Sequence, residues 1–539
     1  MSQLFRLLFT VSILAAILNA QFNWTENGLP IRQGNELWWT RAGDSVSDTE
    51  VVFAWSDTRH GNRNVRASKV NFAGQSLWGE EGFDIGASDD VQEVPQVVGD
   101  GQGGAYIVWV EYDIFHTHIS LRATHINSQG YIDEQLWGVD GTALTSPDQS
   151  DIPFKVCSDE LSGAFVVWID MSDHANPEIR GQRLTTSGPL PDPETAGLPI
   201  AVGGIYGELD LENAGSGEAV LVWTDWIGDG QYLHGQRVDN TLTPLWSEPE
   251  ENGIPICSHP SYKSSPKLAM ESEDIVAVVW VDLHNDMENG DIFLQRIQAD
   301  GGLLMGDGGE AVCTAELDQQ NPQIVATESG LFIVWEDGRN SNQPEQNDIY
   351  AQHWTSAGGM EWAENGTVVS GIDGNQYSPR LIADQCGGVF IIWDDERDAS
   401  FPEVDIYLQH YSPDLIPTFP THGLALVTAP FQQSAPLILP TENCSAFAAW
   451  RDLRSGSPSL FMQSVNPQDG PLLVENGQEL VEGISGKAQD KNILSLDNDE
   501  ILVYWSDQRF GSMQTKIMGQ IVDQNYDLQD FTNGEILDT

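Results

Sequence analysis

The residues most capable of chemistry form the pattern Trp-x-Asp, which several copies extend with an Arg two positions later. In the segment WEDGR, Trp335 and Asp337 precede Arg339 at the end of an apolar run. One such group could form a small charged active site. The pattern recurs nine times, once with Glu111 in place of Asp, whereas a catalytic group is needed only once. We therefore predict a structural role, in which the carboxylate caps N–H groups of a turn and pairs with the arginine.

The tryptophans of these nine copies share one spacing along the chain. They are Trp55, Trp109, Trp168, Trp223, Trp280, Trp335, Trp393, Trp450 and Trp505. Successive members lie 54 to 59 residues apart. Units at so steady a spacing, covering nearly the whole chain, predict a single repeat architecture.

Each repeat of about 56 residues contains four strand-like segments. The second segment is an apolar run such as VFIIW at residues 389–393, which is apolar at successive positions. Such a strand is buried on both faces. In a β-propeller each four-stranded blade is covered by its two neighbours, which explains this pattern. We predict an all-β fold, a single β-propeller of about nine four-stranded blades. Eight blades with an extra unit, or two smaller propellers, are the alternatives.

The sequence contains ten copies of the fourth segment but only nine copies of the second, and the additional copy lies near one end of the chain. Residues 22–31 match the fourth segment before the first complete unit begins, and residues 530–537 match it after the last. One of the two could close the ring by pairing with the opposite end of the chain.

Two further residue types recur within the repeats. The third segment carries a glutamine in seven copies: Gln182, Gln236, Gln295, Gln352, Gln409, Gln463 and Gln520. A polar side chain in a packed layer must be hydrogen-bonded, and we interpret this one as a tie between neighbouring blades. The cysteines fall in separate repeats and are Cys157, Cys257, Cys313, Cys386 and Cys444. Because no C-x-x-C occurs, we predict that most are small buried apolar residues.

The chain begins with a stretch typical of secretion. Residues 1–20 read as a signal peptide, in which Arg6 precedes a short apolar run. Residues 21–539 then form the β-propeller repeat domain of a protein that is extracellular, at the cell surface or periplasmic. No later segment is long and apolar enough to cross a membrane. The formal net charge of −57 repels nucleic acid, so we expect no nucleic-acid partner.

The pattern W-x-D-x-R followed by D-I-Y-x-Q, as in WEDGRN and NDIYAQHW at residues 335–354, resembles repeats of large secreted bacterial propeller proteins. It is also similar to TolB-type propeller repeats, although their Trp-Ser-Pro-Asp-Gly turn is missing. The resemblance implies a propeller with an extracytoplasmic binding or scaffold role, and it supplies no catalytic residues. The Ser-x-Asp-x-Gly-x-Thr-Trp boxes of sialidase-type propellers are absent from the sequence.

The loops between second and third strands vary most in units two to five, which are neighbours around the predicted ring. Variable loops on a rigid scaffold are where binding usually resides. Exposed aromatic rings beside carboxylates suit a glycan or a protein. The candidate ligand-binding residues are Tyr112, Phe115, His116, His118, Asp173, His174, Trp226 and His284.

The loop of unit five also carries four hard oxygen ligands, the type that Ca²⁺ prefers. They are Asp282, Asp286, Glu288 and Asp291. Their spacing differs from the twelve-residue calcium loop, so calcium is a candidate ligand. The sequence indicates no cofactor that the protein requires.

Two functions fit these features. The first is a secreted or cell-surface non-catalytic propeller that binds a protein or a glycan. The alternative is a glycan-cleaving enzyme with a carboxylate site on the loop face. Such an enzyme needs two carboxyl groups about 5–10 Å apart, one of them with a raised pKa. The propeller fold hosts both functions, and the sequence favours binding.

Overall fold

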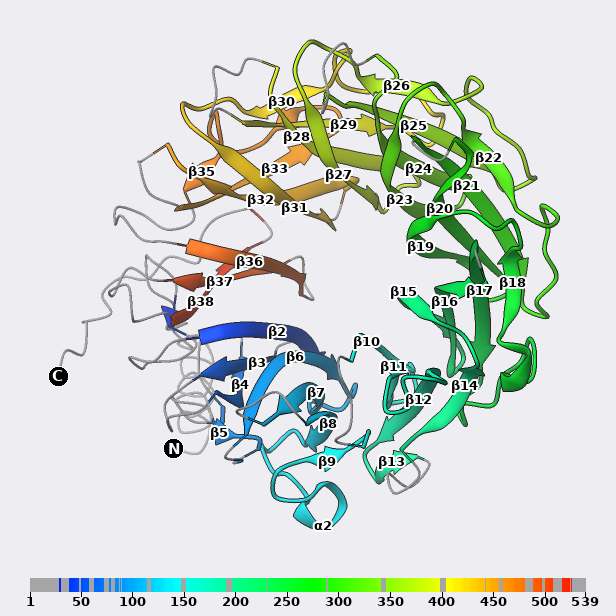
Figure 1. Cartoon of the computed structure of the whole chain (residues 1–539). Helices are drawn as coiled ribbons and strands as arrows, with labels where there is room; N and C mark the ends of the chain where they lie inside the picture. The colour runs from blue at the N-terminus through cyan, green and yellow to red at the C-terminus, as the bar shows by residue number, and fades with distance from the viewer. Residues whose placement is uncertain are drawn as a thin grey trace, which may run out of the picture.

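The fold is nearly all β (Figure 1). The computed structural model describes residues 29–30, 38–47, 50–57, 63–71, 77–78, 83–86, 88, 90–113, 118–146, 152–190, 196–228, 230–286, 289–340, 346–397, 404–441, 443–454, 459–479, 488–496, 500–507, 516–523 and 525. Nine small antiparallel sheets built from these residues follow one another around a ring. The predicted signal peptide and residues 530–537 lie outside the described residues.

Each sheet is one blade, and the first strand of each blade lies nearest the centre of the ring (Figure 1). Blade one consists of β2 (Trp38–Ser47), β3 (Glu50–Asp57), β4 (Asn64–Asn71) and β5 (Phe83–Asp84). Blade two consists of β6 (Val91–Gly99), β7 (Ala105–Tyr112), β8 (Ile119–Ile126) and β9 (Thr142–Ala143). Blade three consists of β10 (Phe154–Ser158), β11 (Ala164–Asp170), β12 (Glu178–Thr185), β13 (Gly188–Leu190) and β14 (Leu198–Val202).

The next three blades keep the same order of strands. Blade four consists of β15 (Tyr206–Gly215), β16 (Glu218–Ile227), β17 (Gly230–Val238) and β18 (Ile254–Cys257). Blade five consists of β19 (Lys263–Ser272), β20 (Ile275–Asp286), β21 (Asn289–Gln298) and β22 (Glu310–Cys313). Blade six consists of β23 (Gln319–Thr327), β24 (Gly330–Asp337), β25 (Asp348–Thr355) and β26 (Thr367–Ser370).

The last three blades complete the ring. Blade seven consists of β27 (Gln376–Ala383), β28 (Val389–Asp395), β29 (Asp405–Tyr411) and β30 (Leu424–Val427). Blade eight consists of β31 (Gln433–Thr441), β32 (Ser445–Asp452), β33 (Ser459–Asn466), β34 (Gly470–Pro471) and β35 (Gln478–Glu479). Blade nine consists of β36 (Ala488–Ser495), β37 (Ile501–Asp507), β38 (Lys516–Val522) and β1 (Leu29–Pro30).

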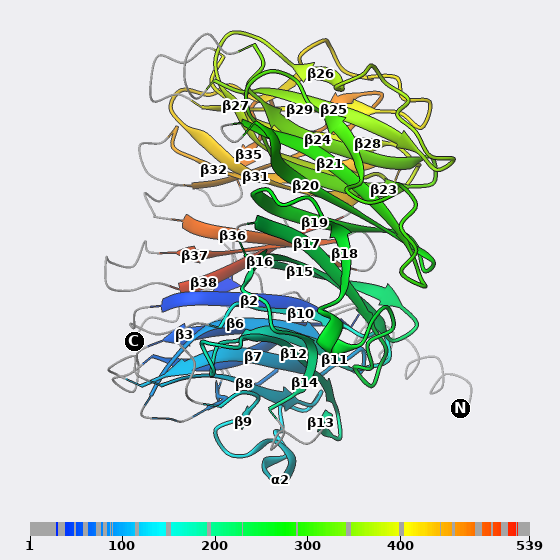
Figure 2. The ribbon, with the colours of Figure 1, turned by 45° about the vertical axis from the view of Figure 1, so that its right-hand side comes forward.

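Helix is almost absent from the described chain. It is limited to α2 (Glu134–Trp137) and the 3₁₀ turn η2 (Pro249–Glu251). The α2 turn lies at the outer edge of the ring in both views (Figure 1, Figure 2). None of the described helices has the length and apolarity that a bilayer crossing requires.

The ring is closed by pairing of an N-terminal strand with a C-terminal strand in the same sheet. Strand β1 pairs antiparallel with β38, with Leu29 opposite Gly519, so the chain start supplies the outer strand of blade nine. Blades nine and one also share a hydrophobic cluster, in which the rings of Phe53 and Tyr504 lie 5.0 Å apart. Every other pair of neighbouring blades shares such a cluster. The prediction of one nine-bladed ring is therefore confirmed, and both alternatives are excluded.

The predicted structural role of Trp-x-Asp-x-Arg is confirmed in blade six. The Trp335 indole N–H donates to Asp337 Oδ2 over 2.8 Å, and the backbone N–H of Arg339 donates to Asp337 Oδ1 over 3.0 Å. The Arg339 guanidinium donates to the same carboxylate over 2.6 Å and to the carbonyl oxygen of Asn365 over 2.7 Å. It also lies 3.9 Å from the ring centre of Tyr350. This group of contacts, here called the Asp–Arg joint, fixes the strand end to the blade.

The Asp–Arg joint is repeated in blades seven and eight. It is formed there by Trp393, Asp395 and Arg397, and by Trp450, Asp452 and Arg454. A glycine faces the Trp ring in each case, and Gly366 in blade six shows why. It adopts a φ of +83°, and a Cβ atom there would lie 2.4 Å from the Trp335 ring. The turn beside the tryptophan ring therefore needs glycine, and blades two to five also have glycine facing this ring.

Two expectations about recurring residues require correction. The glutamines are hydrogen-bonded as predicted, but they tie strands within one blade rather than blade to blade. Gln352 donates to Ala363 O over 2.9 Å and accepts from Trp362 N over 3.0 Å, all within blade six. The bond spans the turn that leads from the third strand to the fourth, whose peptide groups would otherwise be unpaired.

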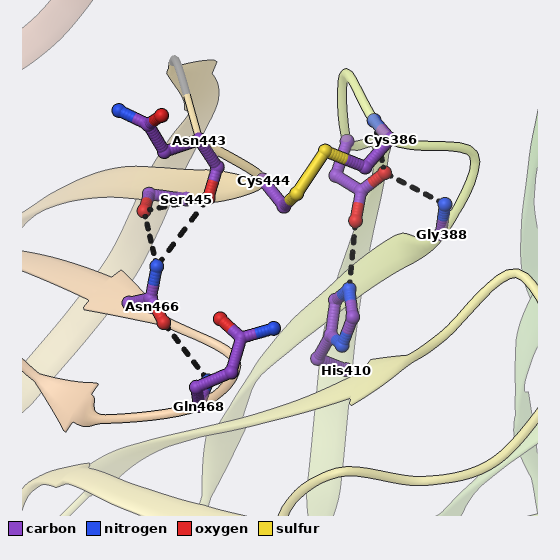
Figure 3. Close-up of a disulfide and its surroundings, with 9 residues drawn as sticks. Cys386, Gly388, His410, Asn443, Cys444, Ser445, Asn466 and Gln468 are labelled. Carbon is purple, nitrogen blue, oxygen red and sulfur yellow. Dashed lines mark hydrogen bonds and ion pairs between the residues drawn. A yellow bond between two sulfur atoms is a disulfide. The ribbon is translucent and has the colours of Figure 1, made fainter.

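Three of the five cysteines are free. Cys257 and Cys313 are buried, as predicted, whereas Cys157 is half-buried. Cys386 and Cys444, however, form a disulfide between the first hairpin turns of blades seven and eight (Figure 3). They are 58 residues apart and occupy equivalent turns of neighbouring blades, which the propeller brings side by side.

Candidate functional site

One face of the ring carries the ends of the second strands and the starts of the first and third strands. We call it the loop face. In blades six to eight this face is occupied by the Asp–Arg joint. Blades two to five hold the same acidic residue with other partners, so their loops are free to differ in sequence.

Blade four shows how a loop is freed. Its Asp225 is buried and accepts from the side-chain amide of Asn252 over 2.6 Å and from Ile205 N over 2.8 Å. No arginine is needed, and the position two residues later is Ile227. Strands β16 and β17 continue beyond Asp225 as a hairpin in which Ile227 pairs with Gly230.

Trp226 and Ile227 of this hairpin belong to a group of exposed apolar side chains that also includes Ile205, before β15, and Tyr262, before β19. Ile205, Trp226, Ile227 and Tyr262 are between 40% and 62% exposed, and we call them the aromatic shelf. The rings of Trp226 and Tyr262 lie 6.4 Å apart, and Trp226 N donates to Ile205 O over 2.9 Å. Two exposed aromatic rings that lie close together are suited to contact with a partner surface or a sugar ring.

A cavity of about 480 Å³ opens between blades two and three, and we call it the blade 2–3 pocket. The described residues that line it are Val94, Gln96, Val110, Tyr112, Ile119, Ile152, Pro153 and Phe154. The Tyr112 hydroxyl donates to Glu93, which also pairs with Arg63. Burial raises the pKa of Tyr112, so its hydroxyl stays protonated.

The structure separates the remaining predicted ligand-binding residues. Tyr112 lies in the blade 2–3 pocket and Trp226 in the aromatic shelf, which are at different blade junctions. His118 lies 3.3 Å from Asp113 at the end of the blade-two loop. Asp173 accepts from Ala175 N over 3.0 Å and so caps its own turn, next to the exposed His174. Phe115, His116 and the side chain of His284 lie outside the described residues.

The predicted calcium ligands are described only in part. Asp282 and Asp291 lie opposite each other on β20 and β21, and both are buried. The Asp282 carboxylate accepts from the Trp280 indole over 3.2 Å and lies 3.4 Å from Lys263 Nζ. The side chains of Asp286 and Glu288 lie outside the described residues. Where side chains are described, no three His, Cys, Asp or Glu gather in a geometry that could hold a metal. Calcium binding stays a prediction.

Two buried carboxylates of blades six and seven were not anticipated. Glu336 and Asp394 occupy the middle position of Trp-x-Asp, on the face toward the next blade. Glu336 accepts from three side-chain amides and from Ser378 N, over 2.8–3.0 Å. Asp394 accepts from Ala435 N over 3.1 Å, and burial raises its pKa to about 7. The charged residue inside a buried apolar run was the available sequence signal.

No protein-family model matches the sequence, and neither does any curated protein. Among solved structures, the polysaccharide lyase Uly1 matches at 9% identity and a TM-score of 0.40, over 84% of this chain and 93% of that one. A eukaryotic initiation factor matches at 9% identity and a TM-score of 0.42, over 84% of this chain and 91% of that one. The α-L-arabinanase of Penicillium chrysogenum matches at 13% identity and a TM-score of 0.29, over 58% of this chain and 92% of that one. Similarities at these identities and TM-scores carry no argument about activity.

Proposed function

We propose that this protein is a secreted or cell-surface, non-catalytic β-propeller that binds a protein or a glycan through the loop face of blades two to five. The observation that carries the proposal is the aromatic shelf. Trp226 lies on the β16–β17 hairpin, and Tyr262 lies just before β19, where its carbonyl oxygen accepts from Leu283 N over 3.0 Å. Both rings are exposed, and their centres lie 6.4 Å apart. Tryptophan and tyrosine dominate the energetics of binding surfaces because they bury large areas at low entropic cost.

The chemistry of the loop face supports binding rather than catalysis. Among the described residues that line the blade 2–3 pocket, none is acidic. The repeated Trp-x-Asp carboxylates of blades four to eight are engaged with neighbouring side chains and turns. A glycoside hydrolase instead needs two carboxyl groups available to the substrate.

Two features support the secreted location. Residues 1–20 have the composition of a signal peptide. The Cys386–Cys444 disulfide is of the kind that persists in oxidising compartments outside the cytoplasm. Calcium is a candidate ligand of the blade-five loop.

The test is a glycan-array and protein-binding screen with residues 21–539, repeated with the double variant Trp226→Ala/Tyr262→Ala. A ligand that binds through the shelf should lose at least about tenfold in affinity in this variant. Tyr131→Ala is the matched control, because Tyr131 is also an exposed aromatic but follows the third strand of blade two. Equal losses in the shelf variant and the control would contradict the proposal.

A second candidate is a glycan-cleaving enzyme, which Asp394 favours. Burial raises the pKa of Asp394 to about 7, a value that suits a general acid. Burial, and then the charges of Asp394, Glu396 and Glu336, raise the pKa of the nearby Tyr377. The test is cleavage of the array glycans by the purified chain. Activity that disappears in Asp394→Asn while the fold is kept would support the enzyme over the binder.

A further inference from the structure

We propose that the blade 2–3 pocket receives an apolar side chain of a basic partner protein. This inference rests on the proposed binding function and names its partner class and its anchor point. It follows from how the pocket is formed, from what lines it and from one strained residue at its edge.

Two features are missing here: the carboxylate between Trp and Asp that blades six and seven carry, and a register shift in the first strand that several other blades contain. In blade six, Glu336 occupies the position between Trp and Asp and accepts from Ser378 N of the next blade over 2.8 Å. Blade two has Val110 at this position, which has no carboxylate to reach across. In addition, β10 pairs with β11 from Phe154 onward without the register shift that the first strands of blades five to eight contain. The space between the two blades is left open.

The lining is suited to an uncharged apolar group. Six of its eight described residues are apolar, and the polar ones are Gln96 and Tyr112. The Gln96 amide points to Phe154 O at 3.5 Å, and the Tyr112 hydroxyl is held by Glu93. A sugar ring would leave its hydroxyl groups without partners against this lining, at a cost for each buried group. The volume of about 480 Å³ lies within the range of ligand-binding pockets.

Val94 at the edge of the pocket is strained and exposed. It adopts a φ of +53° and is 46% exposed. The same position, just before the repeat proline, has φ of +53° or +54° in four other blades, where the residues are Ser265, Asn321, Ser378 and Ala435. Those residues are small or polar, whereas a β-branched residue is disfavoured in this region. A strained, exposed valine at a pocket edge is the pattern expected where binding, rather than stability, selects the residue.

The charge of the chain sets the charge of the partner. A net charge of −57 attracts basic proteins and accelerates their encounter with this protein. The apolar pocket then provides the contact that holds the partner. Attraction alone is non-specific and screened by salt, whereas insertion of a side chain depends on the shape of the site.

The experiment compares two synthetic peptides of alternating glycine and lysine that differ at the centre, one with phenylalanine and one with serine. Binding to residues 21–539 is measured by isothermal titration calorimetry. The phenylalanine peptide should bind about ten- to a hundredfold more tightly, because one aromatic side chain is buried. Added NaCl should weaken both peptides to a similar extent. Equal affinities for the two peptides would overturn the proposal.

Variants locate the site. Val94→Asn installs the residue that blade six has at this position, so it should raise the melting temperature while lowering the preference for phenylalanine several-fold. Val110→Phe should fill the cavity and abolish the preference. Ala435→Asn is the control, since it places the same asparagine at the blade-eight copy of this position, away from the pocket. A preference that survives in both Val94→Asn and Val110→Phe would place the anchor elsewhere and reject the proposal.

The outcomes also separate this inference from the proposed function. Peptides bound without preference, together with a ligand that is lost in Trp226→Ala/Tyr262→Ala, would reject the pocket and keep the binding function. A phenylalanine preference that both pocket variants abolish supports the pocket whether or not the shelf binds anything. Failure of both experiments would reject both.

Discussion

Blades six to eight and blades two to five hold the same buried carboxylate in different ways. In blade six the guanidinium that faces Asp337 comes from the loop, two residues further along. In blade two it comes from the third strand, where Arg122 lies opposite Trp109, contacts Glu111 at 3.1 Å and donates to Gly141 O over 2.8 Å. The guanidinium group faces the carboxylate in both blades, although the arginine comes from a different place in the repeat.

The other variable blades reach the same result with further substitutes. Arg180 of blade three donates to Gly197 O over 2.8 Å, as Arg122 does to Gly141. Blade four uses the amide of Asn252, and blade five uses Lys263 from its first strand. Once the counter-group is supplied from elsewhere, the loop after the second strand no longer has a structural duty. This difference explains why the candidate binding surfaces gather on blades two to five.

The largest expected effect tests whether blades two to five and blades six to eight depend equally on the buried tryptophan of the repeat. Trp335→Ala and Trp223→Ala should each lower the free energy of unfolding by about 3–5 kcal/mol, since both rings are fully buried. The milder substitutions Trp335→Phe and Trp223→Phe should differ in their effect on the free energy of unfolding. Trp335 loses its bond to Asp337, whereas the Trp223 indole N–H has no partner among the described residues. Urea denaturation should show Trp335→Phe to be costlier by about 1 kcal/mol, and the reverse order would contradict the comparison.

The next effect concerns how the free energy of unfolding depends on pH through Asp394 in blade seven. Burial raises the pKa of Asp394 from 3.8 to about 7. The folded protein therefore keeps a proton that the unfolded chain releases, so stability falls as pH rises from about 4 to about 7 and then levels off. Asp394→Asn should remove a contribution on the order of 2–4 kcal/mol from this slope, measured by denaturation at several pH values. Glu336→Gln at the matching position of blade six is the control, and an unchanged slope in Asp394→Asn would contradict the assignment.

The smallest effect concerns the loss of stability when the side chain two residues after the repeated Asp, or its substitute, is removed. Arg339→Ala in blade six and Arg122→Ala in blade two should each cost about 1–2 kcal/mol, because each leaves a buried carboxylate short of a partner. Ile227→Ala, at the blade-four position that corresponds to Arg339, should change stability by less than about 0.5 kcal/mol. Thermal melting of the three variants decides this. A large loss in Ile227→Ala would give that residue a structural role.

Much of the fold could be predicted from the sequence because the repeat is long and regular. The apolar runs ending in Trp fix the second strands, and their spacing fixes the number of blades. The extra segment at residues 22–31 correctly indicated how the ring closes. These features depend on local sequence and on its repetition, which are both visible in one chain.

The rest depends on differences between neighbouring blades. The Cys386–Cys444 disulfide links turns that are adjacent only because the blades are; their spacing of 58 residues, about one repeat, was the available signal. The blade 2–3 pocket coincides with Val110 in place of a carboxylate and with the absence of a register shift in blade three, and the second of these is a feature of backbone geometry that residue types do not reveal. Of the predicted site residues, Tyr112 and Trp226 fall in candidate binding surfaces, whereas Asp173 caps its own turn.

The pairing of β1 with β38 has a consequence for how the molecule is made. Residues 29–30 are synthesised before blade one, whereas their partners at residues 518–519 are synthesised after blade eight. The first eight blades can form in order as the chain emerges, while the ninth needs strands from both sides of them. Until then the outer edge of β38 is unpaired, and an unpaired edge is where chains join wrongly. Completion of blade nine therefore joins a segment made before all the other blades to a segment made after them.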